Sequence, residues 1–380
     1  MSSPTPSRLS WLDAVRGPAA LAVVLHHAGW TYFPGPWAEV DRRIDVGTWG
    51  VFVFFLVSGY IIPASLERHG DVRAFWVGRG LRLLPLLLVA IALALLLAYG
   101  GAYELHQGLT TKPLFLVALG NGTMLQELLG VPAVIGVMWT LSYEMAFYLI
   151  TVALFSTGHA HRSAPVAAAL ALLAVPLGLV LPGAVIGGWL ALLGLPVLAA
   201  IAVTMWGTGR VRTAAAVAGG ALALALVALG SRIGAWQGLI ILAVMFAGTA
   251  VHRAERGQIR WRTAAAALTV VLGCALFAKD DPGWAPAIVA AGACFAAFFA
   301  LRHLSYPRWL THLGVISYST YLLHPLLLRL PSAWSYVLVL LPLAYVTQRF
   351  VELPAQRLAK RLAWARSGGR AVRGEEGARP

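Results

Sequence analysis

Ionisable side chains are scarce in this chain. Only 12% of its 380 residues are Asp, Glu, Lys or Arg, whereas 59% are hydrophobic and the mean hydropathy is +0.76. Soluble globular domains carry roughly twice that share of charge, so the composition excludes an ordinary water-soluble protein. The two cysteines, Cys274 and Cys294, lie in apolar segments, where a thiol behaves as a small hydrophobe. We therefore expect no disulfide framework, and no Cys/His spacing predicts a metal site.

Long polar stretches and internal repeats are also missing. Without them the chain has no room for a second domain outside the membrane. We expect a single membrane domain over residues 1–366. Residues 367–380 are rich in Gly, Arg and Glu, and this composition predicts a disordered cytoplasmic tail.

Apolar segments of about 20 residues, the length that crosses the hydrocarbon layer of a bilayer, fill most of the chain. They predict an all-α, polytopic integral membrane bundle of about 10–12 transmembrane helices. A further apolar stretch, 113–129, is short enough to be re-entrant or interfacial. The predicted spans are 11–33, 46–66, 80–100, 133–157, 165–181, 184–206, 213–230, 235–251, 263–278, 284–301, 312–330 and 334–351.

Lys and Arg are distributed unevenly between the two sides of these spans. With the N-terminus inside, 22 of the 29 basic residues lie in inner loops or tails and five in outer loops. The positive-inside rule therefore predicts that both termini are cytoplasmic in an inner (cytoplasmic) cell membrane. It also explains the net charge of +14, which we assign to topology and to contact with anionic lipid. No nucleic-acid-binding motif accompanies the charge, so we expect no such partner.

Arg16 and His27 share the first predicted span. They are eleven residues apart, and at about 100° per residue this separation places both on one helix face, roughly 16 Å apart along the axis. A charged group at membrane depth is costly, and such groups usually face a bundle interior and mark a pathway or a reactive site. A histidine there can also serve only as a hydrogen-bonding contact between helices.

Glu144 is the acidic residue nearest the middle of a predicted span. A buried carboxylate needs a partner, and the basic groups at similar depth include Arg16, His27 and His324. Glu144 therefore either ties two helices together or belongs to a site. His324, at the end of a Ser- and Tyr-rich segment, is either structural or lines a substrate site.

Arg79 and Arg82 lie at the predicted cytoplasmic start of the third span. Residues three apart project to the same side of a helix, and paired guanidinium groups suit phosphate. Ordinary inside-positive topology explains the pair equally well. In the preceding span, Ser58 and Gly59 follow a run of aromatic residues, and small residues of this kind allow close helix packing.

Taken together, these segments resemble the membrane-bound acyltransferase family 3, which includes bacterial O-acyltransferases of carbohydrates and natural products. The order and spacing match from residue 9 to about 357. The residues that carry the resemblance are Leu12–Gly17 with His27, Phe54–Ile62, Arg79 with Arg82, Trp139–Tyr148, Ile316–His324 and Val351–Pro354.

The resemblance implies an acyl-CoA-dependent O-acyltransferase. His27 would act as general base and Glu144 would orient its imidazole. Acyl-CoA, most simply acetyl-CoA, would be a co-substrate, with no resident cofactor. The acceptor would be the hydroxyl of a carbohydrate, glycolipid or macrolide-type natural product. The residues expected to bind substrate are Arg16, Ser58, Arg79, Arg82, Tyr143 and His324.

Other classes of protein share some of these features. A multi-span transporter or flippase also buries charge, although it typically shows repeat symmetry between its halves. A membrane haem protein could use His27 and His324 as axial ligands. A different membrane acyltransferase family would place its histidine elsewhere. The sequence leaves the acceptor, the acyl chain length and a homodimer open.

Overall fold

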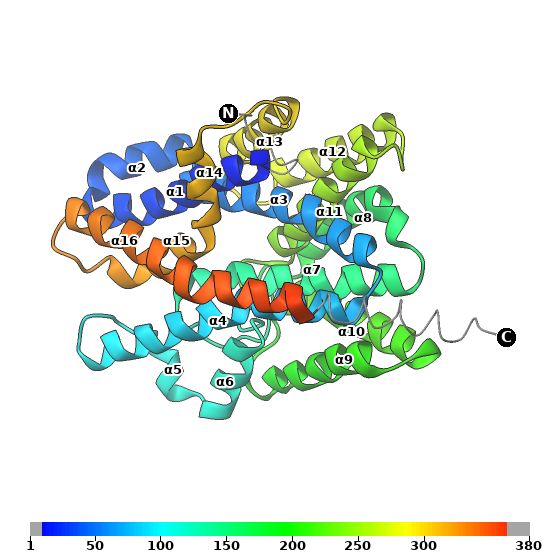
Figure 1. The fold of residues 1–380 in the computed structure, drawn as a ribbon, viewed down its shortest axis with the longest axis horizontal. Coiled ribbons are helices and arrows are strands. Elements are labelled where there is room, and N and C mark those ends of the chain that lie inside the picture. Colours follow the sequence, from blue (N-terminus) through cyan, green and yellow to red (C-terminus); the bar gives the residue numbers. More distant parts are fainter. Residues whose placement is uncertain (1–9, 363–380) are drawn as a thin grey trace.

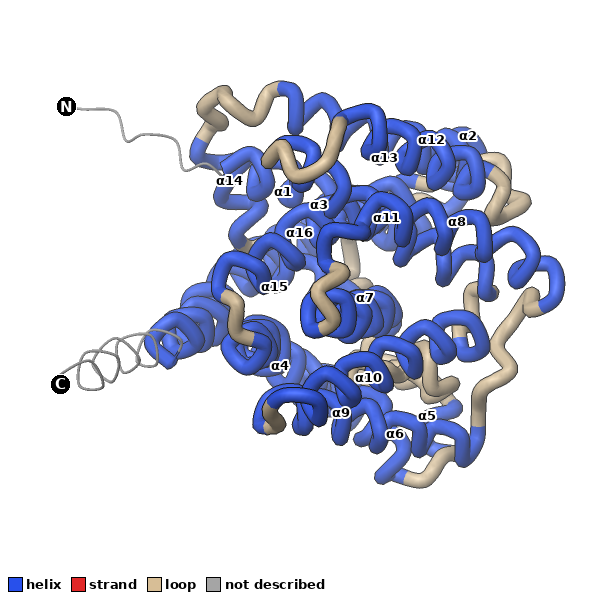
Figure 2. Tube along the Cα trace, turned by 90° about the vertical axis from the view of Figure 1, so that its right-hand side faces the viewer, coloured by secondary structure: helices blue, strands red, loops and turns tan. Residues whose placement is uncertain are grey.

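The computed structural model describes residues 10–362, and these residues form helices and loops with no strand. Most helices run along the long axis of the molecule (Figure 1), and several are seen end-on in the second view (Figure 2). The α-helices are α1 (Ser10–Tyr32), α2 (Pro34–Arg43), α3 (Val46–His69), α4 (Val72–Tyr99), α5 (Gly108–Thr111), α6 (Leu114–Gly122), α7 (Trp139–Ser156), α8 (Ser163–Val180), α9 (Gly194–Trp206), α10 (Gly209–Gly230), α11 (Ala235–Glu255), α12 (Trp261–Leu276), α13 (Trp284–Ala300), α14 (Arg308–Val315), α15 (Ser317–Leu323) and α16 (Ala333–Thr347).

Helix lengths and hydropathy confirm a polytopic helical membrane protein. In the described part, eight helices are long and apolar enough to cross a membrane, and α12 and α13 are shorter apolar helices. The predicted tail, 367–380, lies outside the described residues. α11 is buried along almost its whole length between α3 and α8, so it forms the centre of one half of the bundle. Large apolar side chains of α4 are exposed instead, as expected for a surface that faces lipid.

Two predicted spans have different boundaries in the structure. α4 begins at Val72, capped by Asp71, whose carboxylate accepts hydrogen bonds from the backbone N–H groups of Arg73 and Ala74. Arg79 and Arg82 therefore lie two and three turns inside a helix, and not at its start. The predicted span 312–330 is not one helix. It is divided into α14, α15 and a 3₁₀ turn, His324–Leu327.

The break between α14 and α15 lies where this segment touches α1. A Cβ added to Gly314 would lie 1.9 Å from the backbone oxygen of Asp13, and one added to Gly17 would lie 2.8 Å from the Cβ of Leu313. Glycine at both positions therefore lets the two backbones approach closely. The contact fixes the part of α1 that carries Arg16 against the broken segment.

The expected close packing at Ser58 and Gly59 is also found. A Cβ on Gly59 would lie 1.8 Å from the backbone oxygen of Met245, and one on Gly248 would lie 2.3 Å from that of Leu56. The hydroxyl of Thr249 donates a hydrogen bond of 2.7 Å to the Gly59 carbonyl. α3 and α11 are thus in backbone contact, which sets the position of the α3 face that carries Ser58.

This contact predicts the effect of Gly248→Ala. The added methyl group collides with backbone atoms that cannot rotate away, and we expect a loss of about 1–3 kcal/mol of stability. Gly273→Ala in α12 is the matched control, because its Cβ would meet nothing within 4 Å. Thermal unfolding of the purified proteins in detergent should show a lower midpoint for Gly248→Ala alone; equal midpoints for both variants would contradict the prediction.

Candidate functional site

A first cavity, the entrance cavity, opens where α3 ends and α4 begins. Its walls carry several cationic groups and few acidic ones. The C-terminal helical segment after α16 completes the wall. The polar residues that line the cavity are Ser65, Arg68, His69, Arg79, Arg82, Gln356 and Lys360. A cleft lined by one sign of charge raises the local concentration of an oppositely charged ligand, so this cavity favours anions.

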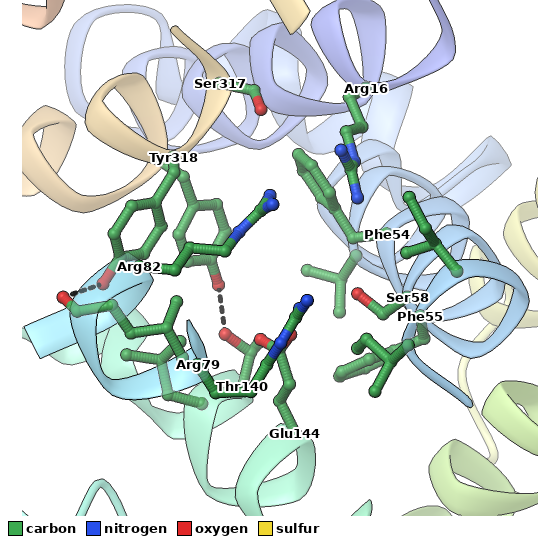
Figure 3. Close-up of a pocket in the computed structure, with 16 residues that line it drawn as sticks. Arg16, Phe54, Phe55, Ser58, Arg79, Arg82, Thr140, Glu144, Ser317 and Tyr318 are labelled. Carbon is green, nitrogen blue, oxygen red and sulfur yellow. Dashed lines mark hydrogen bonds between the residues drawn. The ribbon is translucent and has the colours of Figure 1, made fainter. Parts of the chain in front are cut away.

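A second cavity, the arginine cavity, lies deeper in the bundle and shares Arg79 and Arg82 with the entrance cavity. Figure 3 shows the guanidinium groups of Arg16, Arg79 and Arg82 extending into one central space from different sides. The elements that supply its walls are α1, α3, α4, α7 and α15. Its polar lining residues are Arg16, Ser58, Arg79, Arg82, Thr140, Glu144, Ser317, Tyr318 and Tyr321.

Neighbouring side chains hold the charged groups of the arginine cavity. The hydroxyl of Tyr148 donates a hydrogen bond of 2.6 Å to Glu144 Oε1. The guanidinium carbon of Arg79 lies 5.9 Å from the centre of the Tyr148 ring, within the range of a cation–π contact. Arg16 lies 3.7 Å from the carboxylate of Asp13 and interacts electrostatically with Glu144, Arg79 and Arg82. Three guanidinium groups outnumber the carboxylates of Glu144 and Asp13, and the excess positive charge suits an anionic ligand.

A third cavity, the histidine cavity, lies beyond the arginine cavity. It combines two tryptophan rings with polar groups, which is typical of a site for a small polar molecule. Its lining residues include His26, His27, Asp45, Thr48, Trp139, Gln237, Lys279, Trp284 and Tyr321. Val51 and Tyr321 line both this cavity and the arginine cavity, so the two are neighbours that share a wall.

Hydrogen bonds select the tautomer of His27. Its Nδ1 lies 2.9 Å from the Val23 carbonyl, which can only accept, so Nδ1 carries a proton. The same Nδ1 lies 3.3 Å from Nε2 of His324. Nδ1 of His324, in turn, donates to the Tyr321 carbonyl at 2.7 Å. In the neutral pair, the single proton on His27 Nδ1 is therefore shared between the Val23 carbonyl and, more weakly, Nε2 of His324, and Nε2 of His27 keeps a free lone pair that can take up a proton.

The wall between the two inner cavities is held by α7. Tyr321 donates a hydrogen bond of 3.1 Å to the Val137 carbonyl, and its hydroxyl lies 2.9 Å from Thr140 Oγ1. The ring of Tyr321 also packs edge-on against Phe54, at 5.9 Å between ring centres. These contacts fix the phenol between the space that contains Arg16 and the space that contains His27.

The structure brings together most of the residues singled out from the sequence, but in two groups. Arg16, Ser58, Arg79, Arg82 and Glu144 line the arginine cavity, whereas His27 lines the histidine cavity with fully buried His324 beside it. Within residues 10–362, the rings that pack against His27 include those of His324 and His26, at 4.9 and 5.2 Å between ring centres, where we had expected Glu144. Tyr143 lines none of the three cavities: it is fully buried, and its hydroxyl is hydrogen-bonded to Ser231.

Sequence reasoning missed the roles of Tyr148 and Tyr321. For Tyr148 a signal exists, because it stands four residues after Glu144 and therefore on the same side of α7. For Tyr321 a signal exists as well, because it stands three residues before His324 and both follow the break between α14 and α15.

Comparisons with known proteins point to an acyltransferase. The model of an acyltransferase domain, that of acyltransferase family 3, matches residues 9–348. Over 159 residues the chain is 30% identical to nodulation protein 10 of Rhizobium leguminosarum bv. viciae. This alignment covers 36% of this chain and 41% of that protein. Over 76 residues it is 38% identical to O-acetyltransferase PaAT-1 of Phomopsis amygdali, covering 16% of this chain and 15% of that protein.

The chain thus spans less than half the length of either of these curated relatives, and no solved structure matches it. The family model, however, extends over nearly the whole chain and includes α1, α3, α4, α7 and α15, the helices that build the cavities. The chain therefore belongs to acyltransferase family 3.

Proposed function

We propose that this protein is an acyl-CoA-dependent O-acyltransferase of the inner (cytoplasmic) membrane. It moves an acyl group, in the simplest case acetyl, to a hydroxyl of a carbohydrate, glycolipid or macrolide-type natural product. The observation that carries the proposal is the order of the cavities: a basic entrance, then an arginine cavity, then a cavity with a histidine base. The printed name of one relative, an O-acetyltransferase, supports acetyl as the transferred group.

The donor enters through the entrance cavity. Its walls include Arg68, Arg79 and Lys360, which belong to segments that the positive-inside rule assigns to the cytoplasm, where acyl-CoA is found. Guanidinium groups bind phosphate oxygens through pairs of hydrogen bonds, so Arg79 and Arg82 hold the phosphates of the donor. The pantetheine arm then extends through the arginine cavity towards Tyr321. α1 connects the two ends of this path, since Arg16 and His27 lie about 16 Å apart along it.

His27 is the general base. Its Nε2 takes the proton of the acceptor hydroxyl while the hydroxyl oxygen attacks the thioester carbonyl. The C–O bond forms, the C–S bond breaks, and the departing thiolate takes the proton from the imidazolium to leave free CoA. Nε2 of His324 shares the proton on His27 Nδ1 with the Val23 carbonyl, so His324 is a positioning residue that helps to hold the imidazole ring in place.

The acceptor occupies the histidine cavity. The rings of Trp139 and Trp284 offer apolar faces, and Gln237 and Thr48 offer hydrogen-bonding groups beside them. A sugar or polyketide ring has the same alternation of C–H faces and hydroxyls, so it matches this wall. Glu144 has a different task from the one we expected, because its hydrogen bond with Tyr148 supports the aromatic wall beside Arg79.

The phosphate role predicts how the double variant Arg79→Gln/Arg82→Gln binds donor. Each lost charged hydrogen bond weakens binding roughly 10- to 100-fold. Acetyl-CoA should therefore bind far more weakly to the purified variant, and its KM should rise far more than that of the acceptor. Binding of acetyl-pantetheine, which lacks the phosphates, should change little. Calorimetric titration with both donors measures the difference.

The control for this test is Arg210→Gln, since Arg210 is an exposed cation at the start of α10, away from the three cavities. It should leave both affinities unchanged. Equal losses for acetyl-CoA and acetyl-pantetheine in the double variant would show that the arginines act on another part of the ligand.

The base role predicts that His27→Ala abolishes transfer while the protein stays folded and keeps its affinity for acetyl-CoA. Acid–base catalysis of this kind contributes about 10²–10⁴ in rate. Mass spectrometry of surface glycans and small metabolites should find the acylated product in cells with the wild type and with His303→Ala, an exposed histidine, but not with His27→Ala. Normal amounts of product with His27→Ala would remove the mechanism.

The positioning role predicts a difference between two variants of His324. Glutamine can still accept a hydrogen bond from His27 Nδ1 and donate one to the Tyr321 carbonyl, whereas leucine of similar size can do neither. We expect His324→Gln to retain a kcat at least about tenfold above that of His324→Leu, with the same KM for acetyl-CoA in both. If His324 only fills space, the two variants will have equal kcat values.

A further inference from the structure

A second cluster of ionisable groups lies at the mouth of the histidine cavity, where α1, α2 and α3 meet. His26 belongs to α1, Asp41 to α2, and Asp45 is the N-cap of α3. Each offers one ligand atom, and these three atoms lie within 4.8 Å of one another. None of the three takes part in the acyl transfer proposed above, and the sequence gives no recognised spacing for them, since fifteen residues separate His26 from Asp41.

The distances in this cluster are those of ligands around an ion. Nδ1 of His26 lies 3.4 Å from Asp41 Oδ1 and 3.6 Å from Asp45 Oδ1. A charge-assisted hydrogen bond is about 2.7–2.9 Å long, so both separations are too large for one. Ligands at about 2.0–2.2 Å from a tetrahedral ion lie about 3.3–3.6 Å from each other. The observed separations therefore match the edges of a coordination tetrahedron.

Two of the three candidate ligand atoms make no hydrogen bond in the described part of the chain. Within the described residues 10–362, Nδ1 of His26 and Oδ1 of Asp41 are inaccessible to solvent and have no hydrogen-bond partner. Buried polar atoms are normally satisfied, and each exception needs an explanation such as a bound ion. Oδ1 of Asp45 accepts a hydrogen bond of 2.8 Å from Thr48 N, which leaves its second lone pair free.

Charge in this corner also matches a divalent cation. Asp41 is close enough to Asp45 and Asp281 to be repelled by both, and Lys279 is the cation that opposes them. Lys279 itself is paired with Asp281 at 2.9 Å. With His26 neutral, as a metal ligand must be, three carboxylates and one ammonium group leave a net charge of two negative units in the cluster.

The ligands are held in place before any ion binds. A Cβ on Gly47 would lie 2.8 Å from the His26 ring, so the ring packs directly on the backbone of α3. The hydroxyl of Thr48 donates to Asp45 Oδ2 at 2.5 Å and fixes that carboxylate. The backbone N–H of Asp45 donates to the Gly283 carbonyl at 3.0 Å, which ties the cluster to the loop between α12 and α13. Rigid ligands lose little conformational freedom on binding a metal.

We propose that His26, Asp41 and Asp45 bind one Zn²⁺ ion. An imidazole nitrogen among carboxylate oxygens favours zinc over Mg²⁺ and Ca²⁺, which prefer oxygen ligands alone. Three protein ligands leave a fourth position open, as in sites where zinc also holds water or a substrate oxygen. His26 and Asp45 line the histidine cavity, so the open position faces the space beside His27. The ion clamps α1, α2 and α3 together there.

Zinc binding is measured first on the wild-type protein. Purified protein in detergent is stripped with EDTA, dialysed, and titrated with ZnCl₂ by calorimetry, with zinc content determined by mass spectrometry. We expect one Zn²⁺ per chain, a rise in the midpoint of thermal unfolding when zinc is restored, and no comparable effect of Mg²⁺. Stripped wild-type protein that takes up no zinc would overturn the proposal.

Variants then locate the ion. His26→Gln and Asp41→Asn should each weaken zinc binding by more than the roughly 10- to 100-fold that loss of an outer-shell partner costs. His106→Gln, an exposed histidine in the loop before α5, is the matched control and should bind zinc like the wild type. Zinc uptake that is equal in all four proteins would place the ion elsewhere and overturn the assignment. Acetyl-CoA binding, measured in parallel, tests the acyltransferase proposal independently, because these residues lie outside the donor cavities.

Discussion

Three guanidinium groups meet inside a largely apolar helical bundle. The helix contacts around them must offset the electrostatic cost of keeping three like charges close together. Arg16, Arg79 and Arg82 face one another, and among the described residues Glu144 is the one carboxylate on the cavity wall. Like charges in a poorly solvated space repel strongly unless a counter-charge joins them. Close helix contacts at glycines and the break between α14 and α15 hold the helices in the positions that this convergence requires. The carboxylates of Asp13 and Glu352 offset part of this repulsion from outside the cavity wall, and a bound anion would offset more of it.

α1 supplies residues to both the arginine cavity and the histidine cavity. One face of this helix presents Arg16 to the arginine cavity and, three turns later, His27 to the histidine cavity. A rigid helix keeps the separation between the two groups constant, so the proposed donor, bound at Arg16, would have its thioester at a fixed position relative to His27. Precise placement of reacting groups is a large part of enzymatic rate enhancement. Arg16 and His27 therefore act at a fixed separation from each other.

The sequence could predict which residues of the site share a helix face. It could not predict which side chain lies beside His27. The shared face of Arg16 and His27 follows from helix geometry alone, and the pairing of Arg79 with Arg82 follows in the same way. The partner of His27 depends on how α7 is rotated in the bundle and on where the segment 308–327 breaks, and both are properties of tertiary packing. Glu144 was the natural candidate at that depth, but His324, at the point where α15 passes into a 3₁₀ turn, lies beside the ring.

Tyr321 and Val51 belong to the walls of both inner cavities, and this has a consequence for the fate of the donor. An activated thioester is lost if water reaches it before the alcohol does. In the proposed reaction, the phenol ring of Tyr321, held at two points, would lie between the donor in the arginine cavity and the histidine cavity. Productive transfer would then require the acceptor to occupy the histidine cavity before water does. The position of one side chain would in this way limit hydrolysis of the donor.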